Sequence, residues 1–169
     1  MSSTPASTID WNTIRHFSPS EFPEDCLKYM DKSIINTLSK ARNVLPSLYS
    51  FYPSPVYGAH VRTVGTSRHS TQGGERLSDA TDFFVEWKHA WKALEELRRI
   101  PEIGGLGIYT DMMFKGVEGD YCMFHIDNRP ERIEWVSWRT DRNDSNKYVY
   151  LHSDPIMYHN ILVDRAKKK

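Results

Sequence analysis

Four short segments in the second half of the chain combine apolar, aromatic and β-branched residues over lengths that suit strands. Turn-forming residues separate them, among them Gly116, Gly119 and the run from Asn128 to Pro130. Segments this short, bounded by such residues, favour an extended backbone, so the pattern predicts successive strands joined by turns. The four predicted strands are residues 106–114, 120–127, 133–138 and 147–151.

The first half of the chain carries the helical pattern. Residues 25–45 place apolar side chains three or four positions apart, which predicts an amphipathic helix that Pro46 ends. A second helix is predicted over residues 87–100, and two strands, residues 56–64 and 80–85, are predicted between the helices. The chain is therefore predicted to be an α+β protein with an antiparallel central sheet and flanking helices. Four tryptophans are expected to fill the core: Trp87, Trp91, Trp135 and Trp138. For Trp135 and Trp138 the alternative is a position that flanks a cleft.

The length of 169 residues suits one domain with one sizeable core. Residues 1–24 are predicted to be a partly irregular N-terminal arm, frayed over residues 1–10, and residues 25–169 to be a single domain. Lys and Arg together number 22, and so do Asp and Glu. This balance argues against a general nucleic-acid binder, so nucleic acid is not an expected partner.

The sequence also bears on location. No apolar run approaches the roughly 18 residues that a membrane span needs, so a membrane is not an expected partner. Residues 1–10 lack the basic and apolar regions of a signal peptide, which predicts synthesis in a cytoplasm without export by that route. The cysteines Cys26 and Cys122 lie far apart in the chain, so a metal site would rest on histidines and carboxylates.

Two polar segments carry the residues that suit metal chemistry. His69 lies in a predicted loop that leads into the strand carrying Asp82. His125 and Asp127 lie two positions apart on a predicted strand, so both side chains point to one face. Two histidines and one carboxylate from separate segments make a catalytic zinc set, which leaves a fourth position for water. A His-x-Asp pair on a strand also occurs as a purely structural pair.

These residues resemble the zinc D-Ala-D-Ala carboxypeptidase family of peptidoglycan peptidases. Phage endolysins of this type belong to the family, and the Hedgehog signalling domain shares the family's fold. The similarity rests on three elements in the family's order, over roughly residues 55–140: Ser67-x-His69, Ala80-x-Asp82 and His125-x-Asp127, followed by Arg129 and Trp135. The resemblance implies a Hedgehog-like fold and a zinc ion held by His69, Asp82 and His125.

The resemblance also implies roles for the residues around the zinc. A carboxylate is needed as general base, and Asp127 would orient His125 or support the water. An arginine that holds a carboxylate of the substrate is a further family feature, for which Arg62 and Arg68 are the candidates. The substrate would be the peptide stem of peptidoglycan.

The chain departs from the family pattern at three places. Twelve residues separate His69 from Asp82, more than is usual in the family. Ser78 replaces a glycine, which leaves Asp79 as a competing ligand on the opposite side of the strand from Asp82.

The third departure concerns the base. Cys122 stands three positions before His125, where many members have the catalytic carboxylate, and a thiol cannot replace that group. Asp120, Glu118 and Asp127 are the candidates that remain, with Asp127 and Asp120 taken as the catalytic pair.

The function expected from this resemblance is that of a hydrolase. The protein is expected to be a zinc metallopeptidase of the carboxypeptidase or endolysin type. It would act on the cell wall after release by a holin or as a virion component. The alternative is a non-catalytic virion module with the same fold, in contact with other virion proteins. Its metal site would be vestigial or structural, closed by a fourth ligand such as His152 or His159. A third interpretation is an unrelated α+β domain in which the motif match is accidental. In that case His69 and His125 are expected to lie far apart.

Overall fold

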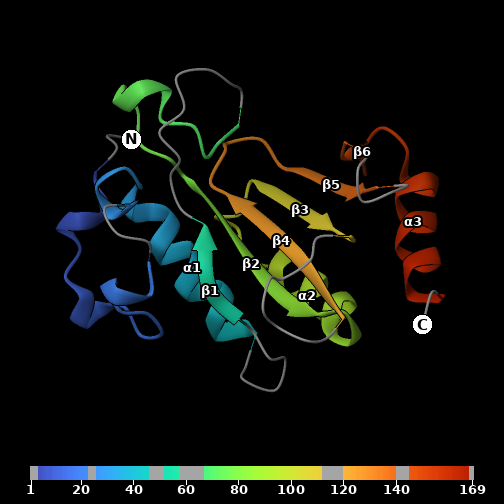
Figure 1. The fold of residues 1–169 in the computed structure, drawn as a ribbon, viewed down its shortest axis with the longest axis horizontal. Helices are drawn as coiled ribbons and strands as arrows, with labels where there is room; N and C mark the ends of the chain where they lie inside the picture. Colours follow the sequence, from blue (N-terminus) through green and yellow to red (C-terminus); the bar gives the residue numbers. More distant parts are fainter. Residues whose placement is uncertain are drawn as a thin grey trace.

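The structure is a computed structural model that describes residues 4–22, 26–45, 52–57, 67–111, 120–139 and 145–167, with the backbone alone for residues 52–57. Its centre is one six-stranded sheet with the order β1-β2-β4-β3-β5-β6, seen nearly face-on in Figure 1. The strands are β1 (Tyr52–Tyr57), β2 (Ala80–Glu86), β3 (Gly105–Tyr109), β4 (Tyr121–Asp127), β5 (Ile133–Trp138) and β6 (Lys147–Tyr150). The predicted α+β class is confirmed.

The sheet is mixed, so the prediction of an antiparallel sheet is wrong at one pair. β3 and β5 run parallel, whereas the other neighbouring strands run antiparallel. The cause is the central position of β4, whose two edges are already paired with β2 and β3. The turn after β4 reverses the chain, so β5 runs opposite to β4 and can only pair with the far edge of β3, in the same direction as β3.

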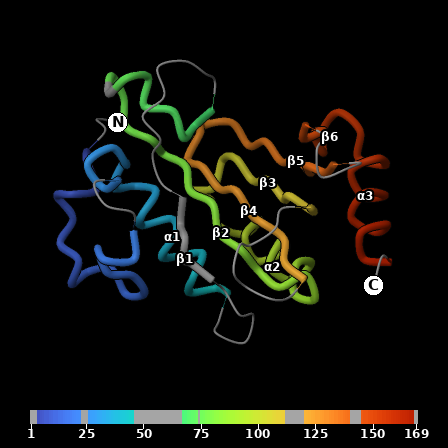
Figure 2. The backbone as a smooth tube through the Cα atoms, in the orientation of Figure 1, coloured from blue at the N-terminus to red at the C-terminus, as the bar shows by residue number. Residues whose placement is uncertain are grey.

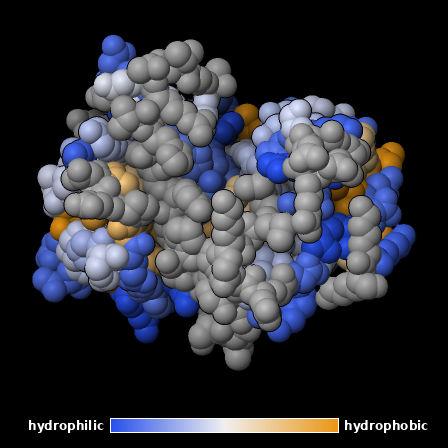
Figure 3. All heavy atoms as spheres, in the orientation of Figure 1, coloured by the Kyte–Doolittle hydropathy of each residue, from blue (hydrophilic) through white to orange (hydrophobic). Residues whose placement is uncertain are grey.

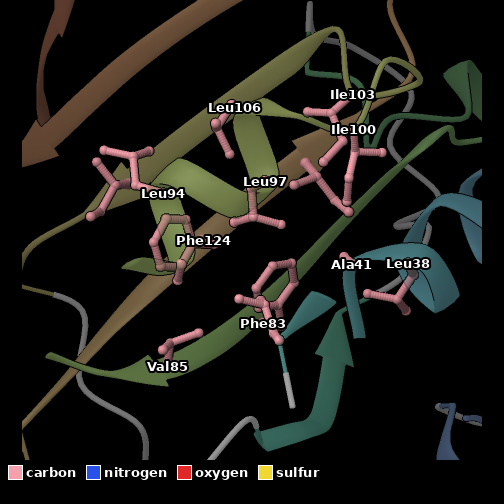
Figure 4. Close-up of a cluster of buried hydrophobic side chains, with 14 of the residues drawn as sticks. Leu38, Ala41, Phe83, Val85, Leu94, Leu97, Ile100, Ile103, Leu106 and Phe124 are labelled. Carbon is pink, nitrogen blue, oxygen red and sulfur yellow. The ribbon is translucent and has the colours of Figure 1, made fainter. Parts of the chain in front are cut away.

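The described residues form three α-helices beside the sheet: α1 (Lys32–Val44), α2 (Ala90–Arg98) and α3 (Pro155–Lys167). Their buried side chains join those of one sheet face in a single core, part of which Figure 4 shows. In that view Leu94 and Leu97 of α2 lie over Phe83 of β2 and Phe124 of β4. Phe83 and Phe124 stack with 5.8 Å between ring centroids. The helices thus cover one face of the sheet and leave the other face for different contacts.

Both predicted helices exist, and both begin later than expected. α1 begins after Asp31, whose Oδ1 accepts a hydrogen bond from the backbone of Ser33 at 2.8 Å, a side-chain cap that fixes the helix start. Before α2, the backbone of residues 87–89 forms a separate 3-10 turn. α2 buries Ala90, Ala93, Leu94 and Leu97. Trp91 lies outside that stripe and is 41% exposed, so its predicted core position is wrong.

The predicted strand over residues 56–64 coincides with β1 only at Val56 and Tyr57, and residues 58–64 fall outside the described residues. The prediction that residues 1–10 are frayed is wrong for the part that is described. Ala6 is fully buried and its backbone donates to Met30 at 2.7 Å. The N-terminal segment (blue in Figure 2) packs beside α1, at the end of the molecule away from α3.

The sequence interpretation missed α3 altogether. Asp154 caps it, because its Oδ1 accepts from the backbone of Met157 at 2.8 Å, and Pro155 takes the first helical position, where a missing N–H costs nothing. Only Tyr158 and Leu162 are buried, too few for a clear helical stripe. Several apolar residues of α3 are exposed, and hydrophobic atoms show over this helix at the right-hand edge of Figure 3.

Candidate metal centre

Strand alternation divides β4 into a core side and a polar side. Cys122, Phe124 and Ile126 belong to the main core under the helices. The alternate residues share the opposite face with their register partners on β2, because paired residues of antiparallel strands point the same way. His125 pairs with Asp82 in this register, so the sheet itself places the two side chains side by side.

His69 completes the group from outside the sheet. Its Nε2 lies 3.0 Å from Nδ1 of His125 and 3.2 Å from Oδ1 of Asp82. Nδ1 of His125 lies 2.9 Å from the same oxygen of Asp82. His69 and His125 are both buried, and their rings meet edge to face. An accidental motif match was expected to leave these two histidines far apart, and the structure instead places them in contact.

The segment that carries His69 is held by its own polar contacts. Ser67 and Ser70 offer backbone carbonyl oxygens, to which the Arg76 guanidinium donates two hydrogen bonds, each of 2.7 Å. The arginine thus closes the loop that separates His69 from β2. This loop includes Gly73, whose φ of 75° lies in the left-handed region that glycine adopts without strain.

Asp79 and Asp82, the two candidate ligands, have different partners. Asp79 accepts a hydrogen bond from Nε of Arg68 at 2.8 Å and a second contact from the same guanidinium. Asp82 instead faces the two histidines. Arg68, a candidate for holding the substrate, is thus engaged with Asp79, whereas Arg62 lies outside the described residues.

Asp127 supports His125 from the side away from Asp82 and His69. It is fully buried, and its Oδ2 lies 3.0 Å from Nε2 of His125. Arg129 holds the same carboxylate through its side chain, with Nε 2.7 Å from Oδ1, and through its backbone N–H. A proton on Nε2 that is donated to Asp127 leaves Nδ1 of His125 to face Asp82 and His69. This is the arrangement in which a carboxylate selects the ligating nitrogen of a metal-bound histidine.

Two glycines of β3 make room for this support, and the sequence interpretation missed both. A Cβ on Gly105 would lie 2.2 Å from Oδ2 of Asp127, and a Cβ on Gly107 would lie 2.5 Å from the Trp135 ring. The Trp135 ring covers Gly107 and comes to 5.2 Å from the His125 ring, between centroids. The available signal was the Gly-x-Gly spacing, which matches the period of the His-x-Asp pair on the neighbouring strand.

The charges of the site stabilise one another. Burial would lower the pKa of His125, but its hydrogen bonds to Asp127 and Asp82 outweigh burial and raise that pKa to about 9. Burial would raise the pKa of Asp82, yet the charge of His69 and the hydrogen bond from His125 hold it well below its usual range. The pKa of Asp127 is low for similar reasons, with hydrogen bonds from His125 and Arg129 outweighing burial. Both carboxylates are therefore ionised at neutral pH, as metal coordination requires.

His69, Asp82 and His125 form a group that could hold a metal ion. Donor atoms on one tetrahedral zinc ion, bound at about 2.0–2.1 Å, lie roughly 3.3 Å from one another. The separations of 2.9, 3.0 and 3.2 Å found here are close to that value. Two imidazole nitrogens and one carboxylate oxygen are also a donor set that zinc accepts. The residues present therefore fit the ion.

The other candidate bases lie elsewhere or outside the described residues. Asp120 precedes β4, at the end of the strand away from Asp127, and forms an ion pair with Arg165 of α3. Cys122 points into the core, where burial raises its thiol pKa far above neutrality, so it can serve neither as base nor as nucleophile. Glu118 falls outside the described residues.

The histidines proposed to close a structural metal site are both exposed. His159 directs Nδ1 to a backbone carbonyl oxygen one turn earlier in α3, and the His152 ring lies against Tyr150. In the described part of the chain, neither joins the group that could hold a metal ion, which consists of His69, Asp82 and His125.

Comparisons with known proteins do not place the chain in a family. No family model matches it, and searches of curated proteins and of solved structures give no significant match. Within the described residues, no helix is long and apolar enough to cross a membrane.

Proposed function

We propose that this protein is a zinc-dependent peptidase that cleaves peptide bonds in bacterial cell-wall peptidoglycan, with a Hedgehog-like fold. One observation carries the proposal: three donor atoms from three separate segments converge within 2.9–3.2 Å of one another, on residues that match the family's three motifs in order. Nucleic acid and membrane play no part in this proposal.

The proposed ligands are His69, Asp82 and His125, and the ion they favour is zinc. Three protein ligands leave one coordination position for water or substrate, whereas structural zinc sites usually have four protein ligands. When bound, zinc supplies Lewis acidity toward water and toward the peptide carbonyl.

The remaining residues act through the ligands. Asp127 is a positioning residue, because its carboxylate is fully occupied by His125 and Arg129 and has no exposed surface for substrate. Arg129 fixes that carboxylate, and Gly105 leaves the space that it fills. None of the three residues Asp127, Arg129 and Gly105 is proposed as the general base.

The test of this proposal is the cleavage of purified peptidoglycan and of defined stem peptides by the zinc-loaded protein. Mass spectrometry of the products identifies the bond that is broken. We expect cleavage that requires zinc and is lost in His69→Ala, with Trp91→Ala, on the helix-covered side of the sheet, as an active control. Intact substrates with a correctly loaded protein would contradict the proposal.

The second candidate is a non-catalytic virion module with the same fold, which keeps zinc for structural reasons or as a vestige. One observation favours it: neither candidate base in the described residues, Asp120 or Asp127, offers a free carboxylate at the metal group. Asp127 is occupied, Asp120 pairs with Arg165, and Cys122 faces the core. Stoichiometric zinc without cleavage of any wall substrate would select this candidate.

A further inference from the structure

The face of the sheet that carries the metal group continues into a row of aromatic side chains. Trp135 pairs with Tyr150 in the register of β5 and β6, and Ser137 pairs with Tyr148. Because paired residues of antiparallel strands point the same way, both tyrosines share the face of Trp135. We call Trp135, Tyr148 and Tyr150 the aromatic ledge.

The ledge is continuous with the metal group. The Trp135 ring lies 5.2 Å from the His125 ring and 6.4 Å from the Tyr150 ring, between centroids. Tyr148 packs edge to face against Tyr109 at 6.2 Å. The contact with His125 depends on Gly107, since any Cβ there would occupy the space of the Trp135 ring.

The outer part of the ledge is open to solvent. Tyr148 is 47% exposed and Tyr150 is 41% exposed, whereas Trp135 is only 7% exposed. β6 is the last strand of the sheet, at the edge away from β1 (Figure 1). Two tyrosines that expose this much of their rings on one short strand, on the same sheet face as the metal group, are better suited to binding than to core packing.

We propose that the aromatic ledge binds a hexosamine ring of the glycan strand to which the substrate's peptide stem is attached. This inference rests on the proposed function, and it extends the substrate from a peptide to a glycan-linked peptide. A sugar ring has a flat apolar face of C–H groups and a rim of hydroxyl and amide groups. A tyrosine ring has a complementary apolar face and a hydroxyl tip.

The distance along the sheet agrees with this substrate. β4, where His125 lies, is separated from β6 by three strand spacings, which amount to roughly 14 Å at about 4.8 Å each. An extended peptide covers that length with about four residues. The stem's own residues are small or charged and offer no flat apolar face, so the sugar ring is the part of this substrate that matches exposed aromatic rings.

The test uses the full-length, zinc-loaded protein with labelled tyrosine and tryptophan rings, observed by NMR. One probe is the peptide-free disaccharide of N-acetylglucosamine and N-acetylmuramic acid, and the other is the glycan-free stem peptide. We expect the disaccharide to shift the ring signals of Tyr148 and Tyr150, and Tyr150→Ala to weaken its binding about five-fold or more, the scale of one aromatic contact. Trp91→Ala, which removes an equally exposed aromatic on α2, should leave binding unchanged.

Cleavage supplies a second readout. Tyr150→Ala should lower kcat/KM for the glycan-linked stem by a larger factor than kcat/KM for the bare stem peptide. The inference is overturned if the disaccharide leaves the ledge signals in place, or if the bare peptide shifts them as strongly. Failure of the proposed function looks different: disaccharide binding at the ledge without any cleavage would leave a glycan-binding module.

Discussion

Asp127 is completely buried beside His125, and its Oδ2 lies 3.0 Å from the Nε2 atom of that histidine. The two residues belong to the same strand and point the same way, so their contact follows from strand alternation alone. The consequence is that Nδ1 of His125, not Nε2, faces Asp82 and His69.

Asp127→Asn should weaken zinc binding while the chain stays folded. The asparagine amide can donate to Nε2 of His125, which favours the tautomer with its proton on Nδ1, where the metal should bind. Loss of such a supporting carboxylate typically costs about 10- to 100-fold in metal affinity. Competition with a chromophoric chelator measures this change. Asp120→Asn is the matched control, since Asp120 directly precedes the same strand and pairs with Arg165 instead of His125. The zinc affinity of this variant should equal that of the wild type.

Gly105→Ala should damage both stability and zinc binding. The added Cβ would lie 2.2 Å from Oδ2 of Asp127, so the carboxylate must move away from His125. Overpacking of this kind costs about 1–3 kcal/mol, measurable by denaturant unfolding. Ala93→Val, which overpacks the core on the helix-covered side of the sheet, should lower stability with unchanged zinc affinity. Equal zinc affinity in both variants would refute the role given to Gly105.

The metal-free protein should lose stability as the pH rises from about 6.5 to about 9. Folding raises the pKa of His125 from 6.5 to about 9, so the folded state binds this proton more tightly than the unfolded state does. The resulting stabilisation is complete below pH 6.5 and is lost as the pH rises through 9. Urea unfolding of chelator-treated protein across this range measures it, with His125→Gln as the variant that should lack the effect. A His125 resonance that titrates below pH 6.5 would contradict the prediction.

The affinity for zinc should depend on pH in the opposite direction to the stability of the metal-free protein. Zinc takes the position of the Nδ1 proton of His125, so its binding releases that proton and its affinity should rise with pH up to about 9. Titrations with zinc at several pH values, in buffers that do not bind the metal, measure the slope. A zinc affinity that is independent of pH between 6.5 and 9 would show that this proton is already absent from the metal-free site.

Cys122→Ala should leave zinc binding and the proposed peptidase activity unchanged, because the thiol faces the core and not the metal group. Cys122→Glu would place a carboxylate at the position of the family's base, but on the wrong side of the sheet. It should cost on the order of 3–5 kcal/mol, the scale of an uncompensated buried charge. Thermal unfolding and activity assays check both variants. Loss of activity in a folded Cys122→Ala protein would be incompatible with this orientation.

The sequence was sufficient for those parts of the site that depend on local periodicity. The alternation of His125 and Asp127 on one face, and of Cys122 on the other, follows from a period of two. The pairing of Asp82 with His125 required the register between β2 and β4, which spacing along the chain does not determine. The motif resemblance nevertheless brought His69, Asp82 and His125 together, and the geometry of the metal group agrees with that set.

The parts that were missed depend on long-range contacts. The parallel pairing of β3 with β5 results from competition for the edges of β4, which no single segment encodes. α3 buries only two residues, so its apolar pattern is weak, and its Asp154-Pro155 start was a local signal that was available. The role of Gly105 and Gly107 became visible only when Asp127 and Trp135 were found above them.

The central claim is that His69, Asp82 and His125 bind one zinc ion. The most direct measurement is the metal content, by mass spectrometry, of the protein purified without chelators, compared with that of His125→Ala. The account predicts about one zinc per chain, lost in the variant while the fold is retained. A wild-type protein without zinc, which takes up none when zinc is added and unfolds no differently from the variant, would contradict it.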